Sequence, residues 1–188
     1  WKDEYNNNIT KVSKAVFSTK GEYIEYNNKI ADTLFFSTSN GFTENSEEIF
    51  GFELPYLRSV QSIWDEETSP VFNDDITYKL TEFYNLLNLP YKDNLKINII
   101  KTSSTGRVLE LEINGSKKIG SEIVDKLKLR SNDFIITKDQ DQVIIKTTGY
   151  GHGVGMSQYG ALGMADNGYL YDEILKYYYQ GIELKKLY

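Results

Sequence analysis

The sequence has no cysteine, one histidine and three prolines among its 188 residues. Without cysteine there can be no disulfide and no thiolate metal site, and a single histidine argues against a zinc centre. Such a chain suits either the cytosol or the exterior of a Gram-positive cell. With so little proline, 26% charged and 40% hydrophobic residues, it is not typical of a disordered or fibrous protein. We therefore expect one globular domain with neither metal nor cofactor.

Positive charge and long apolar runs are also scarce. Lysine and arginine number 21 against 27 acidic residues, which gives a net charge of −6. Because nucleic-acid binding requires a clustered basic surface, we expect no nucleic-acid partner. No segment approaches the roughly 20 apolar residues that cross a bilayer, and no signal peptide is recognisable. The chain begins with Trp1 rather than methionine, so we expect any targeting segment or membrane anchor to lie upstream of it.

Glycine, by contrast, is concentrated in one stretch. Residues 149–161 hold five glycines around His152, directly after the apolar run 142–147. Glycine clusters are useful where the backbone needs positive φ or another group must approach closely. His152, Ser157, Gln158 and Tyr159 lie within this stretch, and a strand that feeds a glycine-rich turn before a helix is a common place for a binding site.

Several chemical interpretations of this stretch can be compared. A phosphate-binding loop needs a lysine or an acidic ribose partner at a defined spacing, and neither is present. Ser157 lies near a helix start, but it breaks the spacing of the G-x-S-x-G nucleophile motif and is equally suited to cap the helix. His152 itself is either a ligand-binding group or a structural histidine that holds a tight turn.

Other polar and aromatic segments also allow two interpretations. The loop from Ser37 to Ser46 carries hydroxyl, amide and carboxylate groups that suit a polyhydroxylated ligand, although such loops are commonly solvated turns. The acidic cluster between Glu44 and Asp75 is typical of a solvated face. The tyrosines at 177–179 are expected to pack mainly in the core, with one ring free to stack on a sugar.

Hydrophobic patterning predicts a mixed α+β fold with largely antiparallel sheets and short helices, because hairpin signals outnumber any regular βαβ alternation. We expect residues 1–188 to form a single domain in which 76–140 is a small inserted subdomain. Ser121 is expected near the N-cap of its helix. Strands are expected at 15–18, 22–26, 33–36, 57–63, 95–101, 107–113, 116–119, 134–137 and 142–147, and helices at 81–88, 121–127, 157–167 and 172–179.

Three blocks of the sequence together resemble one family. They are Phe35–Asn45, Leu54–Val60 with Trp64-Asp65, and Gly149–Ala161 with Tyr177–Gly181. In this order they resemble the stage II sporulation protein D (SpoIID/LytB-type) domain family. The likeness spans nearly the whole chain, and the glycine-histidine block is its most specific part.

This resemblance implies a peptidoglycan lytic transglycosylase that acts while a mother cell engulfs its forespore. Such enzymes cleave the β-1,4 bond between N-acetylmuramic acid (MurNAc) and N-acetylglucosamine (GlcNAc) in strands stripped of stem peptides, which leaves 1,6-anhydro-MurNAc ends. One glutamate can protonate the leaving oxygen and then deprotonate the sugar's own C6 hydroxyl, so a second carboxylate is not required.

The resemblance also assigns roles along the chain. The family's catalytic glutamate precedes an alanine-rich helix expected upstream of Trp1, so we assign no catalytic residue here and expect this chain alone to be inactive. The zinc site of some members uses cysteines and should be absent. The residues expected to form a substrate-binding wall are Ser37, Thr38, Ser39, Asn40, Thr43, Glu44, Asn45, His152, Gly153, Gly155, Met156, Ser157, Gln158 and Tyr159.

The implied partners are denuded glycan strands, a sporulation amidase and membrane proteins. The implied location is extracytoplasmic, at the mother cell–forespore interface of a spore-forming Gram-positive bacterium, with the longer protein anchored in the membrane. The alternative is a non-catalytic glycan-binding module that recruits or activates an amidase.

Overall fold

The computed structural model describes the backbone of residues 2–187 and the side chains of residues 8–187. The chain divides into two units, one made of residues 1–32 and 181–188 and the other of residues 33–180. Within the described part there are seven helices and eleven strands, and all named sheets but one are antiparallel. The predicted α+β class is therefore confirmed. No helix of the described part is long and apolar enough to cross a membrane.

The smaller unit contains one helix and a three-stranded antiparallel sheet. Helix α1 spans Lys2–Ser18, and the strands are β1 (Glu22–Tyr26), β2 (Lys29–Ile30) and β11 (Glu183–Lys186), in the order β11-β1-β2. The strand predicted at 15–18 is wrong, because these residues form the last turn of α1. Ile9, Val12 and Val16 recur at helical spacing, and this longer period outweighs the β-branched content of a four-residue run.

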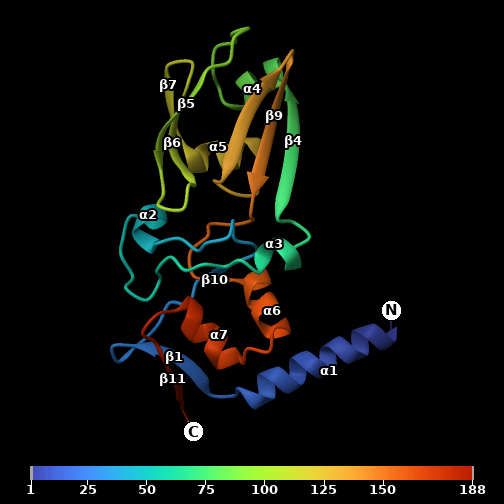
Figure 1. Ribbon diagram of the computed structural model, residues 1–188, viewed down its shortest axis with the longest axis vertical. Helices are drawn as coiled ribbons and strands as arrows, with labels where there is room; N and C mark the ends of the chain where they lie inside the picture. Colours follow the sequence, from blue (N-terminus) through green and yellow to red (C-terminus); the bar gives the residue numbers. More distant parts are fainter. Residues whose placement is uncertain (1, 188) are drawn as a thin grey trace. The chain divides into compact units, whose positions relative to one another are not determined.

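The larger unit contains two three-stranded antiparallel sheets that enclose an apolar core (Figure 1). One sheet has the order β4-β9-β8, with β4 at Asn73–Lys79, β8 at Phe134–Asp139 and β9 at Gln142–Thr148. The other has the order β5-β6-β7, with β5 at Ile97–Thr102, β6 at Val108–Ile113 and β7 at Ser116–Ile119. Helices α4 (Leu80–Leu86) and α5 (Gly120–Leu127) bring Phe83, Ile123 and Leu127 into this core.

All residues of this core lie between positions 76 and 145. This range nearly coincides with the subdomain predicted at 76–140. Burial of fully enclosed side chains such as Phe83, Leu111 and Ile123 is the main stabilising contribution here. Asn114 and Gly115 have positive φ and connect β6 to β7 by the predicted tight turn. Whether the region folds independently stays a prediction.

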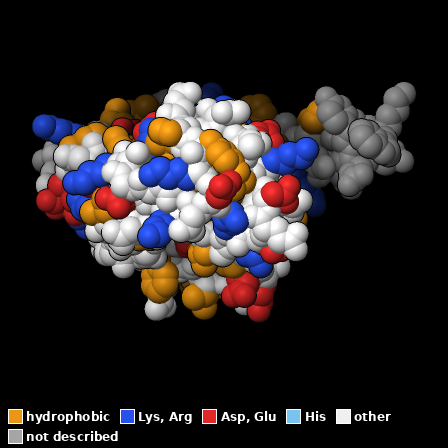
Figure 2. Space-filling model, turned by 90° about the horizontal axis from the view of Figure 1, so that it is seen from above, with side chains coloured by type: hydrophobic (Ala, Val, Ile, Leu, Met, Phe, Trp, Pro, Cys, Tyr) orange, Lys and Arg blue, Asp and Glu red, His pale blue; other side chains and the backbone are white. Residues whose placement is uncertain are grey.

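The rest of this unit is built from loops and short elements. Strand β3 (Phe35–Phe36) pairs in parallel with β10 (Met156–Ser157), and the helices are α2 (Ser46–Phe50), α3 (Asp65–Thr68), α6 (Gln158–Asp166) and α7 (Tyr171–Tyr178). Seen from above, basic and acidic side chains are interspersed on the visible face (Figure 2).

In this unit one local prediction is wrong and one strand was missed. Residues 57–63 form no named strand, because their backbone groups bond to an irregular loop, as in Thr43 N–H to Val60 O and Ser62 N–H to Gly41 O. Strand β4 was not predicted, since its Asp74-Asp75 pair has low strand propensity. Ser121 is in the first turn of α5, close to the N-cap residue Ile119, as predicted.

Candidate functional site

The glycine-rich stretch adopts the backbone conformation that its composition predicts. Gly149, Gly151, Gly153 and Gly155 have φ values of +79°, +108°, +84° and +84°. Neighbouring segments also approach the stretch closely: a Cβ atom on Gly153 would lie 2.8 Å from Glu44 Cγ. The glycines therefore serve both positive φ and close packing.

The stretch lies against the Ser/Thr-rich loop through backbone hydrogen bonds. Thr38 and Tyr150 exchange two of them, with N···O distances of 3.0 and 2.7 Å, and Glu44 N–H donates to Gly153 O at 2.7 Å. The β3–β10 pairing continues this contact. The structure thus brings together the two segments from which the substrate-binding wall was predicted.

Much of the predicted wall is nevertheless buried. Thr38, Ser39, Thr43, Glu44 and Ser157 are each 0% exposed, and all are hydrogen bonded inside the protein. In this conformation their side chains support neighbouring segments and offer no surface to a glycan. The predicted wall residues that are partly or fully exposed are Ser37, Asn40, Asn45, His152, Met156, Gln158 and Tyr159. Gly153 and Gly155 are buried.

Asp65 is the centre of one buried network. Its carboxylate accepts hydrogen bonds from Ser39 N–H at 2.8 Å, from the Ser62 hydroxyl at 2.6 Å and from the Ser157 hydroxyl. The Ser157 hydroxyl also accepts from Gly160 N–H at 3.3 Å and so caps α6. Of the two roles left open for Ser157, capping is therefore observed.

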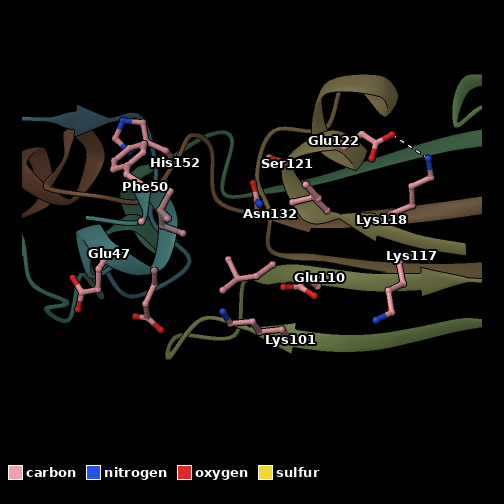
Figure 3. A pocket seen from close by; sticks show the side chains of 15 residues that line it. Glu47, Phe50, Lys101, Glu110, Lys117, Lys118, Ser121, Glu122, Asn132 and His152 are labelled. Atoms are coloured by element: carbon pink, nitrogen blue, oxygen red, sulfur yellow. Dashed lines mark hydrogen bonds and ion pairs between the residues drawn. The ribbon is translucent and has the colours of Figure 1, made fainter. Parts of the chain in front are cut away.

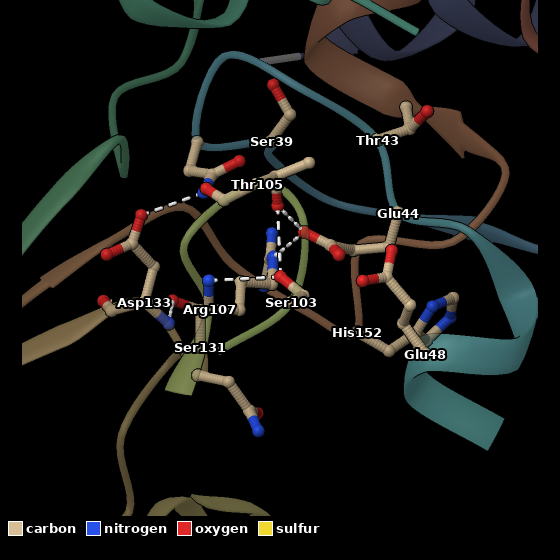
Figure 4. Close-up of polar contacts among 12 residues, drawn as sticks. Ser39, Thr43, Glu44, Glu48, Ser103, Thr105, Arg107, Ser131, Asp133 and His152 are labelled. Atoms are coloured by element: carbon tan, nitrogen blue, oxygen red, sulfur yellow. Dashed lines mark hydrogen bonds and ion pairs between the residues drawn. The ribbon is translucent and has the colours of Figure 1, made fainter. Parts of the chain in front are cut away.

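A second network surrounds Glu44 (Figure 4). Arg107 Nε lies 3.1 Å from Glu44 Oε1, both side chains are at most 1% exposed, and the Thr105 hydroxyl donates to the same oxygen. Arg107 Nη1 donates to Gly151 O at 3.0 Å. Burial raises the pKa of Glu44, while Thr105 and Arg107 oppose this rise. The pair joins the histidine loop to the start of β6.

Polar side chains outside these two networks tie neighbouring loops together. Asn40 Nδ2 donates to Asp133 Oδ2 at 2.8 Å, and Asn45 Nδ2 donates to Glu48 Oε2 at 2.9 Å. Glu48 also accepts from the backbone N–H and the hydroxyl of Ser104, at 2.7 and 2.6 Å. The bonds between Glu48 and Ser104 connect α2 to the loop between β5 and β6.

His152 is the part of the glycine-rich stretch that reaches a cavity. Its Nδ1 accepts a hydrogen bond from Val154 N–H at 3.1 Å, and its ring centroid lies 5.7 Å from that of Phe36 and 5.5 Å from that of Phe50. Burial lowers the pKa of His152, a hydrogen bond with the backbone of Phe35 opposes this, and nearby Arg107 adds to the lowering. The ring is therefore held neutral at neutral pH.

The cavity is a groove of about 970 Å³ between α2 and the β5-β6-β7 sheet with α5 (Figure 3). Its volume falls in the range of small-molecule sites, which is roughly 300–1,000 Å³. Phe50, Leu109 and Ile119 give it apolar surface, and Asn132 and Ser121 give it neutral polar groups. Its charged lining residues are Glu47, Glu48, Lys101, Glu110, Lys117, Lys118 and Glu122.

His152 alone among the predicted wall residues lines this groove. The other lining side chains are spread over three strands, two helices and a loop, and none belongs to a recognisable motif. Because they come together only through packing, no sequence signal could have grouped them. Among the described residues, no cluster of three or more histidines or carboxylates is arranged to hold a metal.

Comparison with known proteins gives one family and several relatives. The profile of a family described as a domain of unknown function, DUF8618, matches residues 3–155. The chain is 40% identical to stage II sporulation protein D of Bacillus subtilis and of Bacillus amyloliquefaciens, over 99% of this chain and 54% of each relative. It is also 25% identical to the amidase enhancer of Bacillus subtilis, over 92% of this chain and 32% of that relative.

These matches confirm the family resemblance that the sequence motifs suggested. The chain spans about half the length of the sporulation proteins that it matches.

Proposed function

This chain belongs to the family described as DUF8618, and we propose that it is the glycan-binding part of a peptidoglycan lytic transglycosylase of sporulation. The reaction proposed is cleavage of MurNAc–GlcNAc β-1,4 bonds in denuded strands to give 1,6-anhydro-MurNAc ends. Its 40% identity to stage II sporulation proteins D supports a role in the sporulation cell wall. The extracytoplasmic face of the mother cell–forespore interface is the proposed location.

The observation that carries the proposal is the groove beside His152. It combines exposed apolar side chains, Phe50 and Ile119, with amide, ammonium and imidazole groups. A pyranose ring has one apolar face of C–H groups and a rim of hydroxyls, so it needs both kinds of contact. A groove lined in this way suits a glycan strand better than a compact, uniformly apolar ligand.

The chain's role in this proposal is to bind and orient the strand. A neutral His152 can exchange a hydrogen bond with a sugar hydroxyl or with a carboxyl group from outside these residues. Glu44 is unsuited to be the catalytic acid, because it is fully buried and paired with Arg107. As the family resemblance implies, the acid of this proposal lies outside these 188 residues, and intramolecular attack by the C6 hydroxyl removes the need for a second carboxylate.

A direct test uses the longer protein that contains this chain. Denuded glycan strands are incubated with it, and the products are analysed by mass spectrometry. Anhydro ends are expected. Reducing ends would show a hydrolase and overturn the proposed reaction. In parallel, His152→Ala in the 188-residue chain should weaken glycan binding without a large loss of stability.

A second function is favoured by the similarity to the amidase enhancer. In this alternative the chain binds wall glycan without cleaving it and recruits or activates an amidase. Stem-peptide release by a purified sporulation amidase, measured with and without the protein, separates the two. Stimulated release with no anhydro ends would support the alternative.

A further inference from the structure

Two phenylalanines at the end of α2 remain exposed beside the groove. Phe50 is the last residue of the helix and is 39% exposed, and Phe52 is 56% exposed. Their ring centroids are 6.1 Å apart, and their ring planes differ by 24°. This separation is that of offset rings and not of a face-to-face sandwich, so part of a face of each ring stays uncovered.

Gly51 accounts for the arrangement of the pair. It has a φ of +79° at the C-terminal cap of α2, and its N–H donates to Glu47 O at 3.0 Å. A left-handed residue at this position turns the chain back, which brings Phe52 beside Phe50. Apolar contacts at helix ends stabilise the cap through burial, but Phe52 stays more than half exposed. Capping therefore does not account for the exposed ring of Phe52.

The pair continues the groove past its lining. Phe50 lines the groove together with His152, and their ring centroids lie 5.5 Å apart. Phe50 is thus in ring contact with both His152 and Phe52, whereas Phe52 is not among the described residues that line the groove. Figure 3 shows Phe50 and His152 together at one end of the lining side chains, with Lys117 and Lys118 at the other. A strand that leaves the groove at the Phe50 end meets Phe52 next.

We propose that Phe52 forms a further sugar-binding subsite outside the groove, for the glycan strand whose other sugars occupy the groove. This inference rests on the proposed function. The C–H face of a pyranose packs on an aromatic ring without any contribution from charge, so the subsite accepts GlcNAc and MurNAc alike. An added subsite of this kind makes the affinity depend on the number of sugars in the strand.

The test measures binding of denuded MurNAc–GlcNAc oligosaccharides to the 188-residue chain by isothermal titration calorimetry. The native chain should bind a hexasaccharide more tightly than a disaccharide. Phe52→Ala should weaken hexasaccharide binding about fivefold, which corresponds to the loss of one aromatic contact, and should leave disaccharide binding unchanged. Because the ring is exposed, the unfolding midpoint of this variant should also be unchanged.

Further variants separate a stacking ring from a merely apolar side chain. Phe52→Trp should retain the hexasaccharide affinity, whereas Phe52→Leu, which keeps the apolar character but has no flat ring, should lose it. Phe50→Ala should weaken binding of both oligosaccharides, because Phe50 lines the groove itself. Phe42→Ala is the matched control, since Phe42 is 42% exposed in the same unit but does not line the groove.

The outcomes distinguish this inference from the proposed function. If Phe52→Ala binds the hexasaccharide as the native chain does, or loses affinity for both oligosaccharides equally, the separate subsite is overturned and the proposed function stands. If the native chain binds neither oligosaccharide, the proposed function is overturned as well.

Discussion

Arg107 and Glu44 form a buried ion pair directly beneath the histidine loop. The 3.1 Å between Nε and Oε1 is accompanied by a hydrogen bond from Arg107 Nη1 to Gly151 O. Glu44 Oε2 and Arg107 Nη2 are buried without a hydrogen-bond partner in the described structure. The pair therefore holds two charges away from water and anchors the backbone on which His152 is placed.

Glu44→Gln should destabilise the protein strongly. The substitution leaves the Arg107 guanidinium buried without its counter-charge, and breaking a buried pair in this way costs about 3–5 kcal/mol. Urea unfolding followed by circular dichroism measures the loss. Lys176→Gln, which breaks an exposed pair with Asp172, is the control and should change the midpoint little. Equal effects of the two substitutions would contradict the assigned role.

His152 should titrate below its ordinary pKa of 6.5. Because folding lowers this pKa, the neutral ring stabilises the fold fully above about pH 6.5, and that contribution is lost as pH falls through the folded-state value. The sequence has a single histidine, so one imidazole resonance reports the titration by NMR. The urea-unfolded chain supplies the reference. A folded midpoint at or above the unfolded one would disprove the shift.

Gly155→Ala should cost more stability than Gly168→Ala. The two glycines have similar φ, +84° and +88°, so both substitutions carry the left-handed strain of about 1–2 kcal/mol. Only at Gly155 would the new Cβ overlap a backbone atom, the carbonyl oxygen of Leu34, whereas nothing lies within 4 Å at Gly168. Thermal unfolding of both variants isolates the packing contribution. Equal losses would show that φ alone matters.

Asp65→Asn should destabilise the fold by about 1–3 kcal/mol. Both oxygens of the carboxylate accept hydrogen bonds, from Ser39 N–H and from the hydroxyls of Ser62 and Ser157. In asparagine an NH₂ group replaces one oxygen, and this group cannot accept the hydrogen bond that the oxygen accepted. Denaturant unfolding measures the change. Glu66→Gln, at an exposed position beside it, is the control. If glycan binding were lost at full stability, Asp65 would belong to the ligand site and not to the framework.

The sequence predicts local structure well where local chemistry dominates. Asn114-Gly115 determines the turn between β6 and β7, because few other residue pairs tolerate positive φ at both positions. The helix predicted at 172–179 is observed as α7, Tyr171–Tyr178. The strand predicted at 15–18 is wrong, since four residues cannot establish a period and the longer helical pattern of α1 prevails.

The candidate site was only partly predictable. His152 could be selected because it is unique and surrounded by glycine, and it does line the groove. Thr38 and Thr43 looked equally suited to a ligand, yet both are buried. A hydroxyl that bonds to a sugar and a hydroxyl that bonds to a neighbouring loop have the same sequence signature, and only burial distinguishes them.

By itself, then, the sequence determined the α+β class, the positive φ of the glycine-rich stretch and the family resemblance, because each can be read from residue types and short motifs without knowing which segments are in contact. The tertiary structure alone decided that Glu44 pairs with Arg107, and that His152, Phe50 and Lys117 share one groove. These residues come from separate segments, and hydrogen bonds such as Glu44 N–H to Gly153 O and Arg107 Nη1 to Gly151 O hold those segments together.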